Sequence, residues 1–180
     1  MAKNPLTDST FLTDVKALRA RARKQIEDGA LTPDYELDPE QAIQLLNSAL
    51  ATELVCVLRY RQHAVSASGI HSEPIAAEFL VHSNEELAHA DLIAKRIVQL
   101  GGSPQMDPAS LSERSHSEYV ACDSLDKMIR ENLIAERIAI ESYREMIRYF
   151  GDKDSTTRSM LEGILATEEE HADELADLLE

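Results

Sequence analysis

The residues of this chain best suited to chemistry are two Glu-x-x-His quartets, Glu86–His89 and Glu168–His171. A lone glutamate precedes each quartet by about the length of a helical hairpin. Glu53 lies 33 residues before the glutamate of the first quartet, and Glu136 lies 32 residues before that of the second. Four carboxylates and two imidazoles form the ligand set of a two-metal site, so the chain reads as two copies of one half-site.

The spacing within a quartet suits metal binding by a helix. An offset of three residues is about 300° of helical rotation, which places the glutamate and the histidine on one face. Carboxylate oxygen with imidazole nitrogen suits iron, manganese or zinc. Four carboxylates buried in an apolar core would cost several kcal/mol each without cations, and two divalent cations match their charge. A single quartet is usually structural, but the duplication with matched partners favours a metal site.

The elements that must position these residues are helices. Aromatic residues make up 4% of the 180 residues, and the chain has six glycines, six prolines and no tryptophan. This composition favours helix over sheet, and the length suits a single domain with its own hydrophobic core. We therefore expect an all-α protein.

Capping residues and apolar periodicity predict four long helices. The first runs from about 39 to 67 behind the Asp38-Pro39 cap, and the second from about 73 to 100 before a Gly-Gly-Ser-Pro stop. The third runs from 123 or 124 to 150, and the fourth from about 155 to the end. A long crossover with one short helix near 108–114 separates the two hairpins. A further helix at about 9–28 makes residues 1–37 an N-terminal extension of a bundle domain at 38–180.

The predicted helices bring the six side chains to one height. Glu53 and Glu86 each lie about 14 residues from the turn that joins their helices, and the same holds for Glu136 and Glu168. At ~1.5 Å per residue, each lies roughly 20 Å from its turn. We therefore expect the half-sites to meet in the middle of the bundle.

These residues resemble the ferritin-like superfamily, and most of all the bacterioferritins and the Dps-like proteins with a bacterioferritin-type di-iron site. The resemblance covers residues 39–179 and implies a ferritin-like four-helix bundle. It implies that Glu86 and Glu168 bridge two iron ions. The remaining ligands would be two terminal glutamates and two terminal histidines: Glu53, Glu136, His89 and His171.

The resemblance also implies further features. Tyr60, seven residues after Glu53, matches a redox-active tyrosine, and Tyr143 has the equivalent spacing in the second half. Leu87 stands where bacterioferritins have the haem-ligating Met, so haem is not expected. The chain continues for only nine residues beyond His171. This length leaves no room for a fifth helix, and the resemblance then implies a homo-oligomeric dodecamer rather than a shell of twenty-four subunits.

The activity implied by the resemblance is that of a ferroxidase. It would oxidise Fe(II) with O2 or H2O2, store Fe(III) in the oligomeric shell and protect against oxidative stress. Two alternatives stay open: a manganese centre with catalase-like peroxide disproportionation, and a Dps-like DNA-protecting protein that uses the basic stretch Lys16–Lys24. The net charge of −15 opposes contact with DNA or an anionic membrane.

Two cysteines far apart, with no signal peptide and no uninterrupted apolar run of membrane-spanning length, predict a cytoplasmic protein. Three further residues have an open role. Cys56 follows Glu53 by one helical turn and would face the same interior. His82 shares a face with Glu86 and His89 and is either an accessory ligand or an ordinary half-buried histidine. Asn132, one turn before Glu136, is either a hydrogen-bond partner of a ligating imidazole or a solvent-facing residue.

Overall fold

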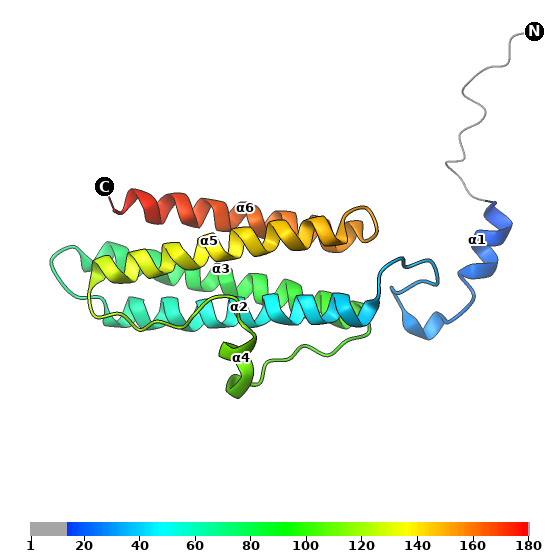
Figure 1. Ribbon diagram of the computed structural model, residues 1–180, viewed down its shortest axis with the longest axis horizontal. Helices are drawn as coiled ribbons and strands as arrows, with labels where there is room; N and C mark the ends of the chain where they lie inside the picture. Colours follow the sequence, from blue (N-terminus) through cyan, green and yellow to red (C-terminus); the bar gives the residue numbers. More distant parts are fainter. Residues whose placement is uncertain (1–13, 180) are drawn as a thin grey trace, which may run out of the picture. The chain divides into compact units, whose positions relative to one another are not determined.

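The computed structural model describes residues 14–179, in which every regular element is a helix. Its four long helices are α2 (Pro39–Ser66), α3 (Ser72–Gln99), α5 (Leu125–Phe150) and α6 (Ser155–Asp177). The helices pack as two hairpins, α2 with α3 and α5 with α6, and the hairpins pack on each other (Figure 1). This arrangement confirms the predicted all-α four-helix bundle.

Local signals in the sequence set the helix ends. The Asp38 carboxylate accepts a hydrogen bond from the Glu40 backbone N–H at 3.0 Å, and Pro39 occupies the first turn of α2. The Asp154 carboxylate caps α6 in the same way by accepting the Thr157 N–H at 2.9 Å. Gly151 ends α5 with a φ of 47°, a conformation that few other residues adopt. These ends agree with the predicted bounds to within one or two residues.

The crossover between α3 and α5 runs along the length of the bundle, because α5 begins at the end opposite to that where α3 stops (Figure 1). It contains the predicted short helix, α4 (Pro108–Arg114), whose Leu111 packs against Ala51 and Val55 of α2. Arg114 donates to the Asn47 carbonyl at 3.1 Å. The Asn47 side chain in turn accepts the Gln105 N–H at 2.8 Å. These bonds hold the crossover against the bundle.

The N-terminal segment differs from the prediction of one helix over residues 9–28. Within the described residues it contains a short helix, α1 (Val15–Arg21), and a 3-10 turn, η1 (Ile26–Asp28), while residues 9–13 lie outside the description. Neither element has a buried residue, and Val15 and Ile26 are 51% and 68% exposed. A helix this short gains little stability from its own hydrogen bonds. The chain divides between Tyr35 and Glu36 into two compact units, and we propose that residues 1–37 form an extension and residues 38–180 form the bundle domain.

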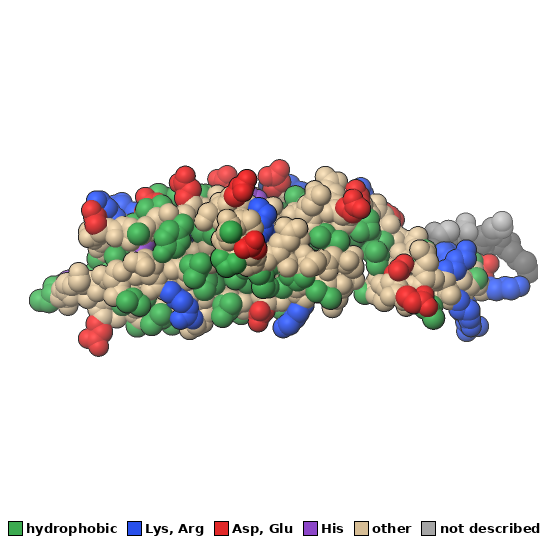
Figure 2. Space-filling model, turned by 90° about the horizontal axis from the view of Figure 1, so that it is seen from below, with side chains coloured by type: hydrophobic (Ala, Val, Ile, Leu, Met, Phe, Trp, Pro, Cys, Tyr) green, Lys and Arg blue, Asp and Glu red, His purple; other side chains and the backbone are tan. Residues whose placement is uncertain are grey.

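Several large apolar side chains of α2 and α3 are exposed. Figure 2 shows hydrophobic side chains spread over one face of the bundle among scattered acids. The exposed apolar residues of these two helices are Leu58, Val65, Leu80, Val81, Leu87, Leu92 and Val98. Scattered exposed apolar residues are normal, whereas a contiguous apolar patch marks a surface for contact with a partner. The α2 helix is also long and apolar enough to cross a membrane, but 61% of its most apolar window is buried in the bundle.

Candidate metal centre

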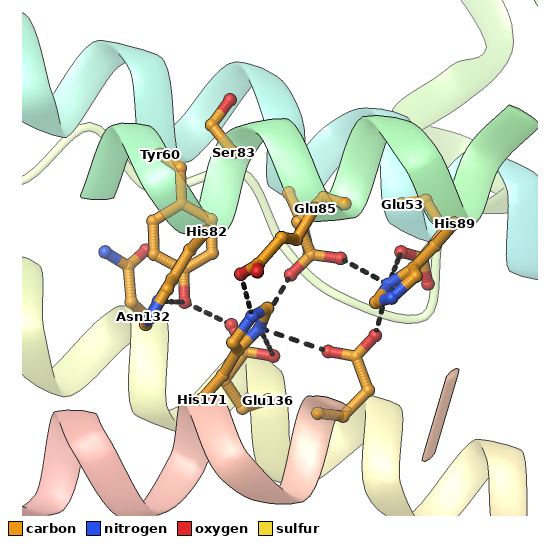
Figure 3. A network of polar contacts seen from close by, with 12 residues as sticks. Glu53, Tyr60, His82, Ser83, Glu85, His89, Asn132, Glu136 and His171 are labelled. Carbon is orange, nitrogen blue, oxygen red and sulfur yellow. Dashed lines mark hydrogen bonds and ion pairs between the residues drawn. The ribbon is translucent and has the colours of Figure 1, made fainter. Parts of the chain in front are cut away.

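All six residues of the two predicted half-sites lie together inside the bundle. Figure 3 shows four of them, Glu53, His89, Glu136 and His171, in one network of polar contacts. Each of the four long helices contributes at least one of them, and all six are buried. They are Glu53 on α2, Glu86 and His89 on α3, Glu136 on α5, and Glu168 and His171 on α6. Their assembly agrees with the predicted geometry, and their role as metal ligands remains a prediction.

The six residues form two ligand groups that share two members. In each group, one ligand atom from every residue lies within 4.8 Å of the others. Glu86 and Glu168 belong to both groups. Glu53 and His89 complete the first group, and the other two residues complete the second. The arrangement therefore fits two neighbouring metal ions with the two shared glutamates between them.

The donor atoms face one another without forming hydrogen bonds. His89 Nδ1 lies 3.0 Å from a Glu168 oxygen and 3.4 Å from a Glu53 oxygen. His171 Nδ1 lies 3.7 Å from a Glu86 oxygen. Several buried side-chain atoms of the described site residues have no hydrogen-bond partner: Glu53 Oε2, Glu86 Oε1, His89 Nδ1, Glu136 Oε2, both Glu168 oxygens and His171 Nδ1. Buried polar atoms are otherwise almost always paired, so these atoms could bind cations.

Burial strongly perturbs the acids of the site. Burial first, and then the negative charge of Glu86, raises the pKa of Glu53 and of Glu168 well above the usual value. The pKa of Glu136 is raised by the same two causes. Burial alone would also raise the pKa of Glu86, but its contacts with His171 and His89 outweigh burial and lower it. Glu86 is therefore the carboxylate that stays ionised most readily.

Both histidines take up protons readily in the metal-free protein. Burial alone would lower the pKa of His89, but the carboxylates of Glu53 and Glu86 outweigh it and raise this pKa to about 10. Glu86 and Glu136 likewise raise the pKa of His171 to about 9. At neutral pH the metal-free centre therefore holds imidazolium groups among carboxylates, and a bound cation replaces protons.

Two tyrosines, one from each hairpin, form hydrogen bonds with glutamates of the centre. The Tyr60 hydroxyl donates to Glu136, and the Tyr143 hydroxyl donates to Glu53. Both rings are buried, and burial together with the nearby carboxylate charge raises the pKa of each phenol well above its usual value. Tyr60 thus lies in direct contact with the centre, and its role as an electron donor stays a prediction.

Sequence reasoning missed some residues around the centre. Glu85 accepts a hydrogen bond from His171 Nε2 at 2.8 Å, and the residue gave no signal beyond its place beside Glu86.

Asn132 is buried, but its side-chain oxygen accepts from Arg59 at 3.0 Å and contacts His63 at 3.2 Å. It is thus neither solvent-facing nor bound to a ligating imidazole. Cys56 is buried within 3.5 Å of the Arg59 guanidinium and belongs to neither ligand group.

The amino-acid sequence is similar to a known protein family and to individual relatives. The family model described as a ferritin-like domain matches residues 43–180. The bacterioferritin of Rhodobacter capsulatus is 30% identical over 137 residues, which cover 74% of this chain and 79% of the relative. The bacterioferritin of Streptomyces coelicolor is 31% identical over 144 residues, which cover 79% and 81%.

Solved structures agree with the sequence comparison. A dodecameric thioferritin, the bacterioferritin-related protein of Bacteroides fragilis, superposes with a TM-score of 0.77 at 35% identity, and the match covers 80% of this chain and 87% of that one. The Dps protein of Thermosynechococcus elongatus has a TM-score of 0.75 at 21% identity, over 78% and 91% of the two chains. The second match shows a shared fold alone.

Proposed function

Because this chain belongs to the family of ferritin-like domains, we propose that it is a ferroxidase that binds two Fe(II) ions within one subunit and oxidises them. The observation that carries this proposal is the pair of ligand groups that share Glu86 and Glu168. Glu53 and His89 hold one ion, and Glu136 and His171 hold the other. Fe(II) is the substrate in this reaction, and the Fe(III) product leaves for storage.

The charge of the centre suits this reaction. Four carboxylates balance the charge of two Fe(II) ions, and oxidation adds one positive charge to each ion. Carboxylate oxygens are hard, anionic ligands, so they stabilise the more highly charged Fe(III). With H2O2 as oxidant, two Fe(II) ions each give up one electron, and the peroxide with two protons becomes two water molecules. A paired site allows this two-electron step without release of a one-electron oxygen radical.

Tyr60 is the electron donor beside the centre in this proposal. Its hydroxyl binds Glu136 directly, and its ring is fully buried. A phenol in that position can give an electron to the centre and a proton to a neighbouring base. Either O2 or H2O2 can accept the electrons that leave the iron centre.

We propose that twelve copies of the chain form the shell that stores the oxidised iron. The exposed apolar residues of α2 and α3, such as Leu58 and Leu92, supply a surface for contact between copies. A dodecameric relative at 35% identity supports that number. Cys56 and Cys122 are free thiols, which fits a cytoplasmic location.

The test is Fe(II) oxidation after anaerobic loading. Wild type and Glu86→Gln receive two Fe(II) ions per subunit, followed by O2 or H2O2, and Fe(III) formation is measured with time. Asp91→Asn is the matched control, because Asp91 is an exposed acid on the same helix. Glu86→Gln should lose at least tenfold in rate while the control stays at the wild-type rate. Equal rates in all three proteins would remove the proposal.

The same proteins test the manganese alternative. Protein purified without added metal is analysed for iron and manganese, and the Mn(II)-loaded form is mixed with H2O2 in an oxygen electrode. The ferroxidase proposal expects no rapid release of O2. Rapid O2 release with manganese, together with failure to oxidise Fe(II), would assign the centre to peroxide disproportionation instead.

A further inference from the structure

A third group of side chains that could bind a metal ion lies outside the six-residue centre and consists of Glu78, His82 and Glu174. One ligand atom from each lies within 4.8 Å of the others. His82 Nε2 is 2.9 Å from a Glu174 oxygen and 3.4 Å from a Glu78 oxygen. Glu78 and His82 are one turn apart on α3, and Glu174 comes from α6. We propose that these three side chains form a third site for a divalent transition-metal ion, separate from the paired centre.

Both ring nitrogens of His82 have a partner, because Nδ1 lies 3.2 Å from the Tyr60 oxygen and Nε2 lies 2.9 Å from a Glu174 oxygen. The Tyr60 hydroxyl donates its hydrogen to Glu136, so its oxygen is left as an acceptor for His82 Nδ1 at 3.2 Å. With Nδ1 held by the Tyr60 oxygen, an ion that binds Nε2 would replace the hydrogen that Nε2 shares with Glu174. Metal-ligating histidines in proteins are commonly fixed by a hydrogen bond from the other ring nitrogen in this way.

The orientation of the ring is also fixed before any ion binds. His82 is fully buried and stacks on the His171 ring, with the ring centroids 4.0 Å apart and the planes at 19°. Figure 3 shows His82 and Tyr60 on one side of His171 and His89 on the other. Nε2 therefore points at Glu78 and Glu174 without the loss of side-chain freedom that a mobile histidine would suffer.

The two carboxylates make the site reachable and set its charge. The side chains of Glu78 and Glu174 are 40% and 45% exposed, whereas the ring between them is buried, so an ion can arrive from solvent and meet a fixed nitrogen. Two carboxylates with a neutral imidazole balance one divalent cation. The nitrogen ligand favours Zn(II), Fe(II) or Mn(II) over Ca(II) or Mg(II), which prefer oxygen ligands alone.

The experiment is equilibrium dialysis of the full-length protein against Zn(II), followed by metal analysis per subunit. Zn(II) does not change oxidation state, so the count does not depend on iron oxidation. Wild type should bind three ions, two at the paired centre and one at the third site. The double variant Glu78→Gln with Glu174→Gln should bind two. Both substitutions keep the side-chain size and leave His82, Tyr60 and the six clustered residues unchanged.

The matched control is Glu73→Gln with Asp173→Asn, which removes two exposed acids from the same two helices outside the cluster. It should still bind three Zn(II) ions, and thermal melting should show that both double variants fold. Crystals of the zinc-loaded wild type should place the third ion about 2 Å from His82 Nε2. A wild type that binds only two ions, or a cluster variant that keeps the control's count, would overturn the site. The ferroxidase proposal could fail while this loss of one ion still occurs.

Discussion

The Tyr60 hydroxyl on α2 donates a hydrogen bond to the Glu136 carboxylate on α5, although 76 residues separate the two in the chain. Tyr143 on α5 makes the equivalent bond to Glu53 on α2. Each hairpin therefore supplies a phenol to the lone glutamate of the other hairpin. The two halves differ on one side, because His82 Nδ1 lies 3.2 Å from the Tyr60 oxygen. Because of this internal symmetry, Tyr143 is a matched control for Tyr60, the proposed electron donor.

Replacement of either tyrosine by phenylalanine tests which ring gives up an electron. We expect a tyrosyl radical signal by electron paramagnetic resonance when Fe(II)-loaded wild type reacts with H2O2. The signal should persist in Tyr143→Phe and disappear in Tyr60→Phe. Among residues 14–179, the Tyr60 hydroxyl has an imidazole nitrogen within hydrogen-bonding distance and the Tyr143 hydroxyl does not. Loss of the signal in Tyr143→Phe with retention in Tyr60→Phe would reverse the assignment.

Metal binding should stabilise the folded chain. At a free concentration 100 times the dissociation constant, one bound ion adds about 2.7 kcal/mol, because only the folded state holds the ligands together. For a chain of this size, each kcal/mol shifts the melting temperature by roughly 2 to 4 °C. We therefore expect a rise of at least about 5 °C when Mn(II) or Zn(II) is added to metal-free protein. An unchanged melting temperature would mean that the buried acids do not bind these cations.

Glu168→Gln should separate stability from metal binding. Glu168 is buried with an oxygen in each ligand group, and both of its oxygens lack a hydrogen-bond partner. Burial and the negative charge of Glu86 oppose ionisation of Glu168 by raising its pKa, so a permanently neutral glutamine should make the metal-free variant more stable by about 1 kcal/mol in urea unfolding. It should also lose most of the stabilisation by metal. A variant that is less stable without metal, or equally stabilised by it, contradicts this account.

Residue spacing was sufficient to predict the helices and the six clustered residues, because both depend on regular helix geometry. Equal distances from the turns place Glu53 and Glu86 at one height whatever the packing. The crossed bonds of Tyr60 and Tyr143 were not predictable, since they depend on how the two hairpins are rotated against each other. Glu85 was also not predicted, because an acid directly next to a predicted ligand adds no further regular spacing to the sequence. Apolar periodicity at residues 9–28 predicted one helix, but periodicity does not show whether buried contacts will stabilise that helix along its whole length.

Stability of the metal-free protein should fall as pH rises above neutrality. His89 and His171 have pKa values of about 10 and about 9 in the folded state, against ~6.5 for an unfolded imidazole. The folded protein therefore binds these protons more tightly. The stability that the folded protein gains from this proton binding is complete below a pH of about 6.5 and is lost as the pH rises through about 9 to 10. The raised pKa values of Glu53 and Glu168 act in the same direction.

Thermal melting at about pH 6.5 and about pH 9 checks this dependence. The metal-free wild type should melt at a lower temperature at the higher pH, and His171→Gln should show a smaller difference. Metal ions compete with the same protons for the histidines. The difference in melting temperature between Zn(II)-loaded and metal-free protein should therefore increase with pH. A wild type and a His171→Gln variant with the same pH dependence would show that the histidine does not bind its proton as the geometry requires.

Glu85 should tune the metal affinity without being a ligand itself. Its carboxylate accepts the His171 Nε2 hydrogen at 2.8 Å, which leaves Nδ1 facing Glu86 and Glu168. Loss of such a partner typically lowers metal affinity by about 10- to 100-fold, because the ring turns more freely and its nitrogen becomes less basic. We expect Glu85→Gln to weaken the ion between His171 and Glu136 while the ion beside His89 keeps its affinity. Anaerobic Fe(II) titration should therefore change from one tight step to two separate steps.

The control for Glu85→Gln is Asp91→Asn, an exposed acid on the same helix that removes the same charge. Glu85 is itself 47% exposed, so its loss should cost less than about 1 kcal/mol of unfolding free energy, and a folding defect is not expected to mask the result. The control should titrate as wild type does. Two equally weakened ions in Glu85→Gln would instead point to a general loss of negative charge around the centre. Unchanged binding would mean that the carboxylates alone hold His171 in its orientation.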